Sequence, residues 1–218
     1  MTILEAIEQR HSVRKYQDKP IEAVKIQELN QEINACNQES NLSIQLITDD
    51  PDVFKGLMAH YGGFRNVTNY IALVGPADST LDEKAGYYGE RIALKAQQLG
   101  LNTCWVAATY KKDRCRAVVS SSQKLVCILA LGYGTTQGTP HKSKPMEKLC
   151  RVNGGGEPPK WFQDGMRAAL LAPTAMNKQN FMITLDGDHV TYEALKGTYT
   201  KVDLGIVKYH FQAAANLL

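Results

Sequence analysis

The sequence of 218 residues predicts an α+β fold, as one compact domain over residues 1–218. Helical spacing of apolar residues, clearest in residues 85–99, alternates along the chain with short apolar runs typical of buried strands, such as residues 126–131. The C-terminal part is too short to bury a core alone. We therefore expect a first module, residues 1–150, with a second, residues 160–218, packed on it.

The first elements follow from local signals. Thr2 and Glu5 form a capping-box pattern, which predicts a docked helix over residues 3–9. Helical spacing of apolar residues predicts a helix over residues 21–36, and period-two alternation predicts a strand over residues 42–48. Asp49-Asp50-Pro51 ends this strand and can start a short helix over residues 52–59.

The middle of the chain holds the clearest helix. Over residues 85–99, Tyr88, Ile92 and Ala96 lie at helical spacing, and Gly100 suits the position after the helix end. Short apolar runs on either side predict extended segments in residues 70–74, 101–107 and 126–131.

Glycine and proline dominate the connection to the second module. Residues 134–160 are predicted to form a surface connector with one helical turn near 145–150. The second module is predicted to begin with a helix over residues 162–172, which Pro173 stops. A strand over residues 181–185 follows and ends at the Asp186-Gly187 turn. Asp203 then caps a last helix over residues 205–217.

Composition excludes several classes of protein. The net charge is +3, from 25 basic and 22 acidic residues, which argues against bulk nucleic-acid binding. We expect a cytoplasmic protein with no membrane partner, because neither a signal-peptide pattern nor a long apolar run is visible. Five widely spaced cysteines without a C-x-x-C pair argue against a disulfide framework and against a metal site.

Motifs of hydrolases and nucleotide-binding folds are also missing. The sequence has no H-E-x-x-H, no G-x-S-x-G and no Walker A segment. Gly132 to Gly138 follows a predicted strand and is close to G-x-G-x-x-G, but its third glycine comes one residue late. The segment runs into Pro140 instead of opening the helix that a dinucleotide fold needs, so a dinucleotide site is the weaker interpretation.

A basic run follows the first helix. In an extended segment Arg10, Ser12 and Arg14 share one face while Val13 points the other way. Two guanidinium groups and a hydroxyl on one face form an anion receptor that suits phosphate oxygens. On composition alone, a solvated basic face remains the alternative.

Arg10 to Tyr16 resembles the opening R-x-S-x-R-x-F/Y motif of the nitroreductase family of flavin enzymes. In that family the segment holds the ribityl phosphate and the pyrimidine edge of FMN. The resemblance implies a nitroreductase-like FMN-binding fold, with a central, mostly antiparallel sheet flanked by helices. It also implies cofactor-binding roles for Arg10, His11, Ser12 and Arg14.

Two later segments carry the same resemblance. Residues 86–107 are similar to the family's L-x-A-x-x-L-G-L-G-T-x-W run, whose helix serves in core and dimer packing. After the strand that ends in a Leu-Gly-Tyr turn, family members carry a basic pair that reaches the flavin phosphate. Here that pair is Lys142 and Lys144, for which a solvated loop is the alternative.

Residues 172–181 resemble the family motif A-P-S-x-x-N-x-Q-P-W, which implies that Pro173, Thr174, Asn177 and Gln179 touch the flavin. In typical members this motif follows the first one closely and reaches across the subunit boundary. Here it lies in the second module, which suggests a rearranged or partly duplicated architecture. We expect a homodimer; the alternative is that one chain supplies both motifs.

The resemblance implies an FMN-dependent oxidoreductase. It would take hydride from NAD(P)H and reduce a small-molecule acceptor, nitroaromatic or quinone-like, in a ping-pong cycle. No catalytic acid or base is expected, because the flavin performs the chemistry. Two alternatives remain: a flavin- or nucleotide-binding storage or sensor protein without turnover, and a phosphate-binding module without flavin. The sequence names neither the acceptor nor the choice between NADH and NADPH.

Overall fold

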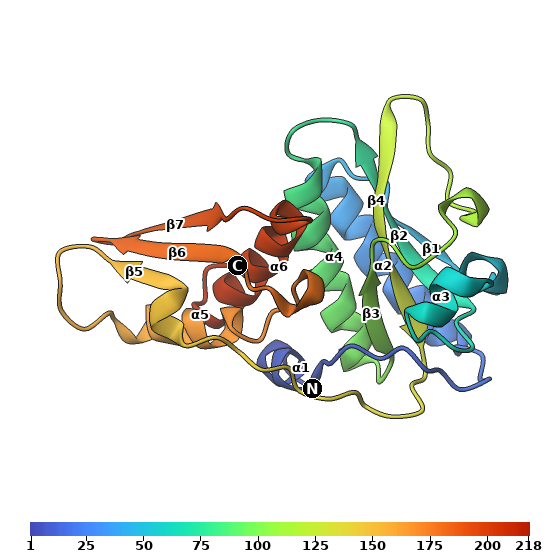
Figure 1. Ribbon diagram of the computed structural model, residues 1–218, viewed down its shortest axis with the longest axis horizontal. Helices are drawn as coiled ribbons and strands as arrows, with labels where there is room; N and C mark the ends of the chain where they lie inside the picture. The colour runs from blue at the N-terminus through green and yellow to red at the C-terminus, as the bar shows by residue number, and fades with distance from the viewer.

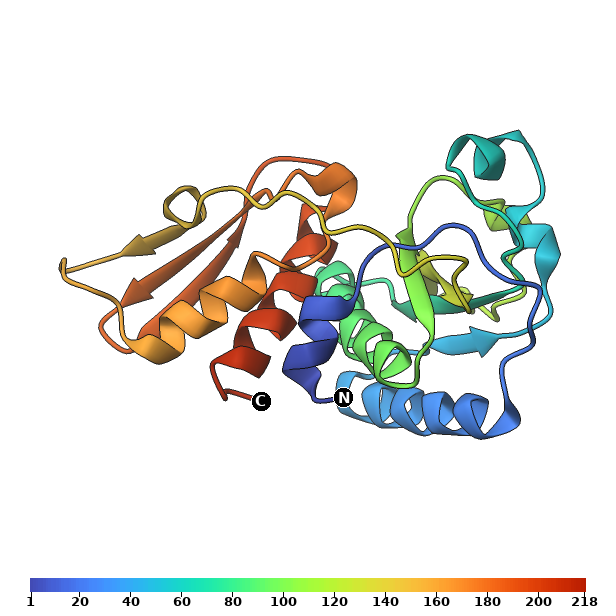
Figure 2. The ribbon, with the colours of Figure 1, turned by 90° about the horizontal axis from the view of Figure 1, so that it is seen from below.

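The computed structural model describes the backbone of residues 1–218 and all side chains except those of Met58 and Ala59. It consists of two parts, each a sheet with helices, that meet along two central helices (Figures 1 and 2). The α+β class predicted from the sequence is confirmed. The α-helices are α1 (Ile3–Gln9), α2 (Ala23–Ser40), α3 (Leu57–Tyr61), α4 (Leu81–Gln98), α5 (Lys160–Ala169) and α6 (Thr200–Ala214).

The larger sheet is antiparallel and lies in the first part. Its strand order is β1-β2-β4-β3, with α2 and α4 packed on one face (Figure 1). The other face is covered by a second apolar cluster that includes Val13 and Phe64. Because both faces are covered, the central strands are continuous apolar runs without alternation. The strands are β1 (Gln45–Ile47), β2 (Asn69–Pro76), β3 (Asn102–Val106) and β4 (Gln123–Gly132).

The smaller sheet has the order β5-β6-β7 and lies in the second part with α5 and α6. Its strand β6 (Phe181–Asp186) was predicted, and β7 (His189–Ala194) pairs with it through the Asp186-Gly187 turn. The strand β5 (Cys150–Val152) pairs parallel to β6 within the connector that sequence patterns assign to loop. A strand of three residues is too short for periodicity to reveal.

The two parts are joined where α4 crosses α6. A Cβ atom at Gly86 would lie 2.0 Å from the carbonyl oxygen of Val202, and one at Gly205 would lie 2.0 Å from that of Glu83. The two helix backbones are therefore in direct contact, which only glycine permits. Tyr87 Oη also donates to Gln212 Oε1 at 2.8 Å across the crossing. One apolar core continues through both parts, from Ile33 and Ile71 to Phe162 and Phe211.

Most predicted elements are present with shifted ends. The capping box of Thr2 and Glu5 is formed in both directions. The helix predicted over residues 52–59 is instead two elements, because the chain turns at Gly56, whose φ is +128°. These are the 3-10 helix η1 (Pro51–Phe54) and α3. The helical turn near 145–150 is the 3-10 helix η3 (Met146–Lys148); the remaining short turns are η2 (Lys112–Arg114) and η4 (Ala175–Asn177).

The start of the last helix was predicted incorrectly. The helix α6 begins at Thr200, so Asp203 lies in its first turn and not at its cap. The Asp203 carboxylate accepts a hydrogen bond from the backbone N–H of Ala175, in another segment. This tertiary contact, which no local pattern encodes, explains the error. None of the helices in the described part of the chain has the length and apolar character needed to cross a membrane.

The helix crossing yields a stability prediction for Gly205→Ala. Intrinsic helix propensity favours alanine over glycine by about 1 kcal/mol. The new methyl group would press on the backbone of α4, however, so we expect a net destabilisation of about 2–4 kcal/mol. Chemical denaturation measures the change. A variant as stable as the wild-type protein, or more stable, would show that the helices do not touch here.

Candidate functional site

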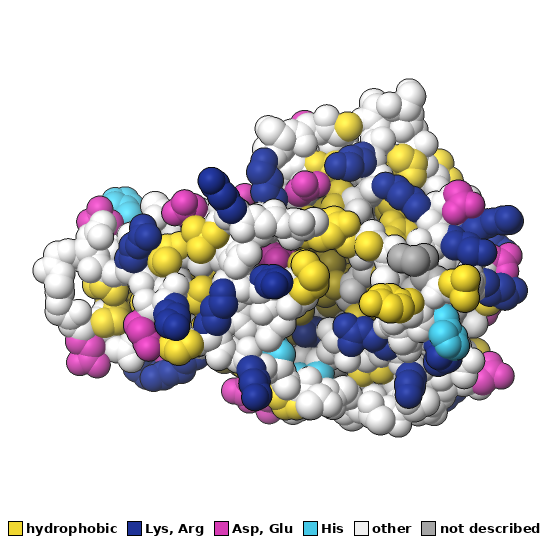
Figure 3. Space-filling view, in the orientation of Figure 1, with side chains coloured by type: hydrophobic (Ala, Val, Ile, Leu, Met, Phe, Trp, Pro, Cys, Tyr) yellow, Lys and Arg dark blue, Asp and Glu magenta, His cyan; other side chains and the backbone are white. Residues whose placement is uncertain are grey.

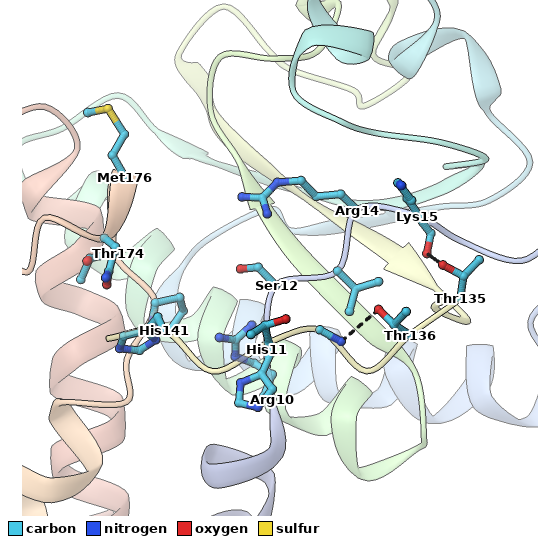
Figure 4. A pocket seen from close by; sticks show the side chains of 15 residues that line it. Arg10, His11, Ser12, Arg14, Lys15, Thr135, Thr136, His141, Thr174 and Met176 are labelled. Atoms are coloured by element: carbon cyan, nitrogen blue, oxygen red, sulfur yellow. Dashed lines mark hydrogen bonds between the residues drawn. The ribbon is translucent and has the colours of Figure 1, made fainter. Parts of the chain in front are cut away.

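A cavity of about 560 Å³ opens where the two parts meet, and Figure 3 shows this hollow from its open side. Three segments line it: the basic run after α1, the loop after β4, and the turn before β6 (Figure 4). The lining residues are Arg10 to Lys15, Thr135, Thr136, Gly138, Thr139, His141, Pro173, Thr174, Met176 and Asn177.

The basic run lies extended against the larger sheet. Val13 donates its N–H to the carbonyl of Thr103 at 3.0 Å, and Tyr16 pairs with Gly134. The Val13 side chain is buried in the core, and the phenol of Tyr16 donates to the Val13 carbonyl at 2.7 Å. The extended segment predicted from the sequence is confirmed, and Arg10, Ser12 and Arg14 all reach the cavity.

The cavity wall is cationic. Arg10 is only 3% exposed, and in the described structure its Nε and Nη1 atoms have no hydrogen-bond partner. Arg14 is exposed and extends into the space between the segments (Figure 4). Burial and the Arg10 charge lower the pKa of His11. No Asp or Glu is among the described residues that line the cavity. Such a wall favours an anion.

The loop after β4 adds two threonines to the lining. Thr135 lies beside the basic run and its hydroxyl donates to the Lys15 carbonyl at 3.3 Å, while Thr136 Oγ1 accepts from Gly138 N at 3.3 Å (Figure 4). Asn102 holds this loop, since its side chain accepts from Gly134 N at 2.9 Å and donates to Gln137 at 2.9 Å. Residues 133–145 contain no helix in the described backbone. The glycine spacing here therefore does not form the strand-to-helix phosphate site of a dinucleotide fold.

The turn before β6 comes from the second part of the same chain. Pro173, Thr174 and Asn177 line the cavity, and Figure 4 shows Thr174 across the open space from Arg14. Gln179 does not line it: this side chain is buried, accepts from Lys144 N at 2.7 Å and donates to the Lys142 carbonyl at 3.0 Å. Gln179 thus fixes the connector against the turn.

The predicted lysine pair lies beside the cavity, not among the residues that line it. Lys142 is exposed. Lys144 directs its ammonium group to the carbonyls of Lys178 at 2.5 Å and Gln179 at 3.2 Å. In this arrangement Lys144 stabilises the turn, and the contact of either lysine with a phosphate stays a prediction.

Sequence patterns missed a buried group behind the cavity wall. Glu90 Oε1 lies 3.3 Å from Arg10 Nε and 2.9 Å from His210 Nε2, while Trp105 donates to Glu90 Oε2 at 2.8 Å. Glu90 sits among the apolar positions of a long helix, and that unusual position is the one local signal that could have drawn attention to it. Among the described side chains, no group of three or more His, Cys, Asp or Glu residues is placed to hold a metal ion.

Comparison with known proteins supplies the context for this cavity. A sequence model of the family described as Putative TM nitroreductase matches residues 2–215. No curated protein matches the chain.

Solved structures share the fold. A putative nitroreductase from Thermotoga maritima MSB8 is 24% identical with a TM-score of 0.67, covering 98% of this chain and 83% of that chain. A putative nitroreductase in complex with FMN from Desulfovibrio desulfuricans is 18% identical with a TM-score of 0.56, covering 72% and 99%. A putative NADH dehydrogenase/NAD(P)H nitroreductase from Parabacteroides distasonis is 22% identical with a TM-score of 0.54, covering 67% and 95%.

Asp203, which holds the turn, gives a pH prediction. Burial raises the pKa of its carboxyl from 3.8 to about 7, against the lowering effect of the Ala175 hydrogen bond. The folded state therefore binds the proton more tightly than the unfolded state. The stabilisation that Asp203 contributes through this tighter proton binding is complete below about pH 4, and it is lost as the pH rises through about 7.

Asp203→Asn keeps an acceptor for Ala175 and removes this ionisation. Relative to the wild-type protein, the variant should therefore gain stability between pH 4 and pH 8, by on the order of 4 kcal/mol at most. Urea denaturation at a series of pH values measures the difference. A difference that does not change with pH would mean that Asp203 ionises freely in the folded protein.

Proposed function

Because this chain belongs to the Putative TM nitroreductase family, we propose that it is an FMN-dependent oxidoreductase. The observation that carries the proposal is the cationic cavity, which joins the two FMN-type motifs of the sequence within one chain. The shared fold with a nitroreductase that was solved in complex with FMN supports the choice of cofactor.

The residues present fit a flavin phosphate. Arg10 offers a guanidinium at the cavity wall, and Arg14 and Ser12 offer a second cation and a hydroxyl from the same strand face. Thr174 and Asn177 offer polar groups on the opposite wall, suited to the polar rim of the ring. The cavity volume lies within the range of cofactor and ligand sites.

The chain's own residues bind and orient; the flavin, when bound, supplies hydride acceptance and electron donation. Arg14 and Lys15 place positive charge at the cavity, where it stabilises negative charge on a bound ring. We propose NAD(P)H as electron donor and a nitroaromatic or quinone-like compound as acceptor in a ping-pong cycle. The name of the Parabacteroides distasonis protein, which includes NAD(P)H nitroreductase, supports NAD(P)H as the electron donor.

A single chain carries both motifs at the cavity, which supports a complete site in each monomer. The homodimer implied by the family resemblance stays a prediction.

The visible spectrum tests the proposal. The purified protein should carry FMN, lose its absorbance on addition of NADH or NADPH without oxygen, and recover it when a quinone or nitroaromatic compound is added. A flavin that binds but never reduces would instead support a storage or sensor protein. A colourless protein that binds no added FMN would contradict the proposal.

Arg14→Gln should weaken FMN binding. Loss of one charge-assisted contact corresponds to about 1.5–3 kcal/mol, or roughly a tenfold to hundredfold higher Kd. The effect should be larger at low salt, and the stability of the flavin-free protein should be unchanged because the side chain is exposed. Fluorescence titration measures the Kd. The matched control is Arg151→Gln, at another exposed arginine, on β5; equal effects of both variants would remove Arg14 from the site.

A further inference from the structure

Three ionisable side chains meet out of contact with water behind the cavity. Arg10 follows α1, Glu90 lies in α4 and His210 lies in α6, and all three side chains are at most 2% exposed. Arg10 and His210 both contact the same oxygen of Glu90, Oε1, so the carboxylate connects the two side chains. The group therefore links the cavity wall to the second part of the chain.

The hydrogen-bond partners of His210 indicate where the protons on its ring nitrogens lie. Its Nδ1 lies 3.0 Å from the carbonyl oxygen of Ala168, which can only accept, so Nδ1 carries a proton. Its Nε2 lies 2.9 Å from Glu90 Oε1, and one further proton must lie between these two atoms. That proton belongs either to an imidazolium or to a neutral carboxylic acid.

Three groups act on the Glu90 carboxylate from different elements. Burial alone would raise the pKa of the Glu90 carboxyl, but Arg10, His210 and the Trp105 N–H together hold it below its ordinary value. Glu90 is thus bound to α6 through His210 and to the cavity wall through Arg10.

Building on the proposed function, we propose that His210 is a positioning residue for phosphate binding by Arg10. It fixes the Glu90 carboxylate at the Nε side of the Arg10 guanidinium, and Glu90 in turn fixes the orientation of Arg10 at the cavity wall. The second part of the chain thereby tunes the phosphate end of the site without touching the ligand.

The incomplete pairing of Arg10 favours this role over a purely structural one. Burying a charged group is costly unless all of its donors and acceptors are satisfied. Arg10 Nε lies 3.3 Å from Glu90, but the buried Nη1 has no hydrogen-bond partner among the described residues. Glu90 is therefore the protein group that orients Arg10 at the cavity wall, and a change in the position of Glu90 should be felt there.

The test compares His210→Gln with Phe211→Leu. Glutamine keeps one donor for Glu90 but cannot bridge Glu90 and the Ala168 carbonyl as the two ring nitrogens do, so it holds Glu90 less firmly. Phe211 is the next residue of α6, equally buried, and packs on Phe162 at a ring distance of 5.4 Å, so its truncation weakens the helix without touching the Glu90 group. Kd values for FMN and for riboflavin, which lacks the phosphate, are measured by fluorescence titration for each protein.

His210→Gln should raise the Kd for FMN about tenfold and leave that for riboflavin within about twofold. Phe211→Leu should change the Kd for FMN and the Kd for riboflavin by the same factor, or change neither. Equal losses of FMN and riboflavin affinity in His210→Gln, or an unchanged FMN affinity, would overturn the proposal.

A second readout needs no ligand. The Nε–H resonance of Arg10, identified by its loss in Arg10→Lys, should exchange slowly with water in the flavin-free wild-type protein and in Phe211→Leu, and faster in His210→Gln. If the wild-type protein does not prefer FMN over riboflavin, the phosphate assignment in the proposed function fails. The exchange rate of the Arg10 Nε–H resonance then still decides whether His210 positions Arg10. An exchange rate in His210→Gln equal to that of the wild-type protein would overturn the proposal.

Discussion

The direct backbone contact between α4 and α6 is the constraint on which the rest of the structure depends. Two glycines, Gly86 and Gly205, let the helices approach until each would-be Cβ atom overlaps a carbonyl of the other helix. A larger side chain at either position would push the two sheets apart. Because the cavity is formed between the two parts, its width follows from this contact.

The crossing also carries polar groups to the site. From α6, Asp203 accepts from Ala175 and holds the turn that lines the cavity, while His210 contacts Glu90 of α4. Lys208 and Glu83 form an ion pair between the same helices. The helix α6 therefore positions both walls of the cavity. It contacts the turn directly through Asp203, and it acts on Arg10 through Glu90.

The turn before β6 is strained in a way that fits this role. Met176, Asn177 and Gln179 all have positive φ, near +50°, which costs free energy for residues other than glycine. Several hydrogen bonds compensate: Gln179 N donates to Thr174 Oγ1 at 3.0 Å, and Asn177 donates to the Lys142 carbonyl at 3.0 Å. Such a turn presents Thr174 and Asn177 to the cavity in a preset orientation.

The sequence by itself determined the elements whose signals are local. The capping box of Thr2, the helical spacing of α4 and the extended basic run were all predicted, because each depends on neighbours within a few residues. Only the tertiary structure decided the contacts between distant segments. The sequence gives no partner for Glu90 or His210, and Lys144 looks like a free cation. Their partners are known only once the α4–α6 crossing and the connector bring these residues together. Burial, charge pairing and the unpartnered nitrogen atoms of Arg10 are properties of that assembly, since they depend on residues far apart in the chain.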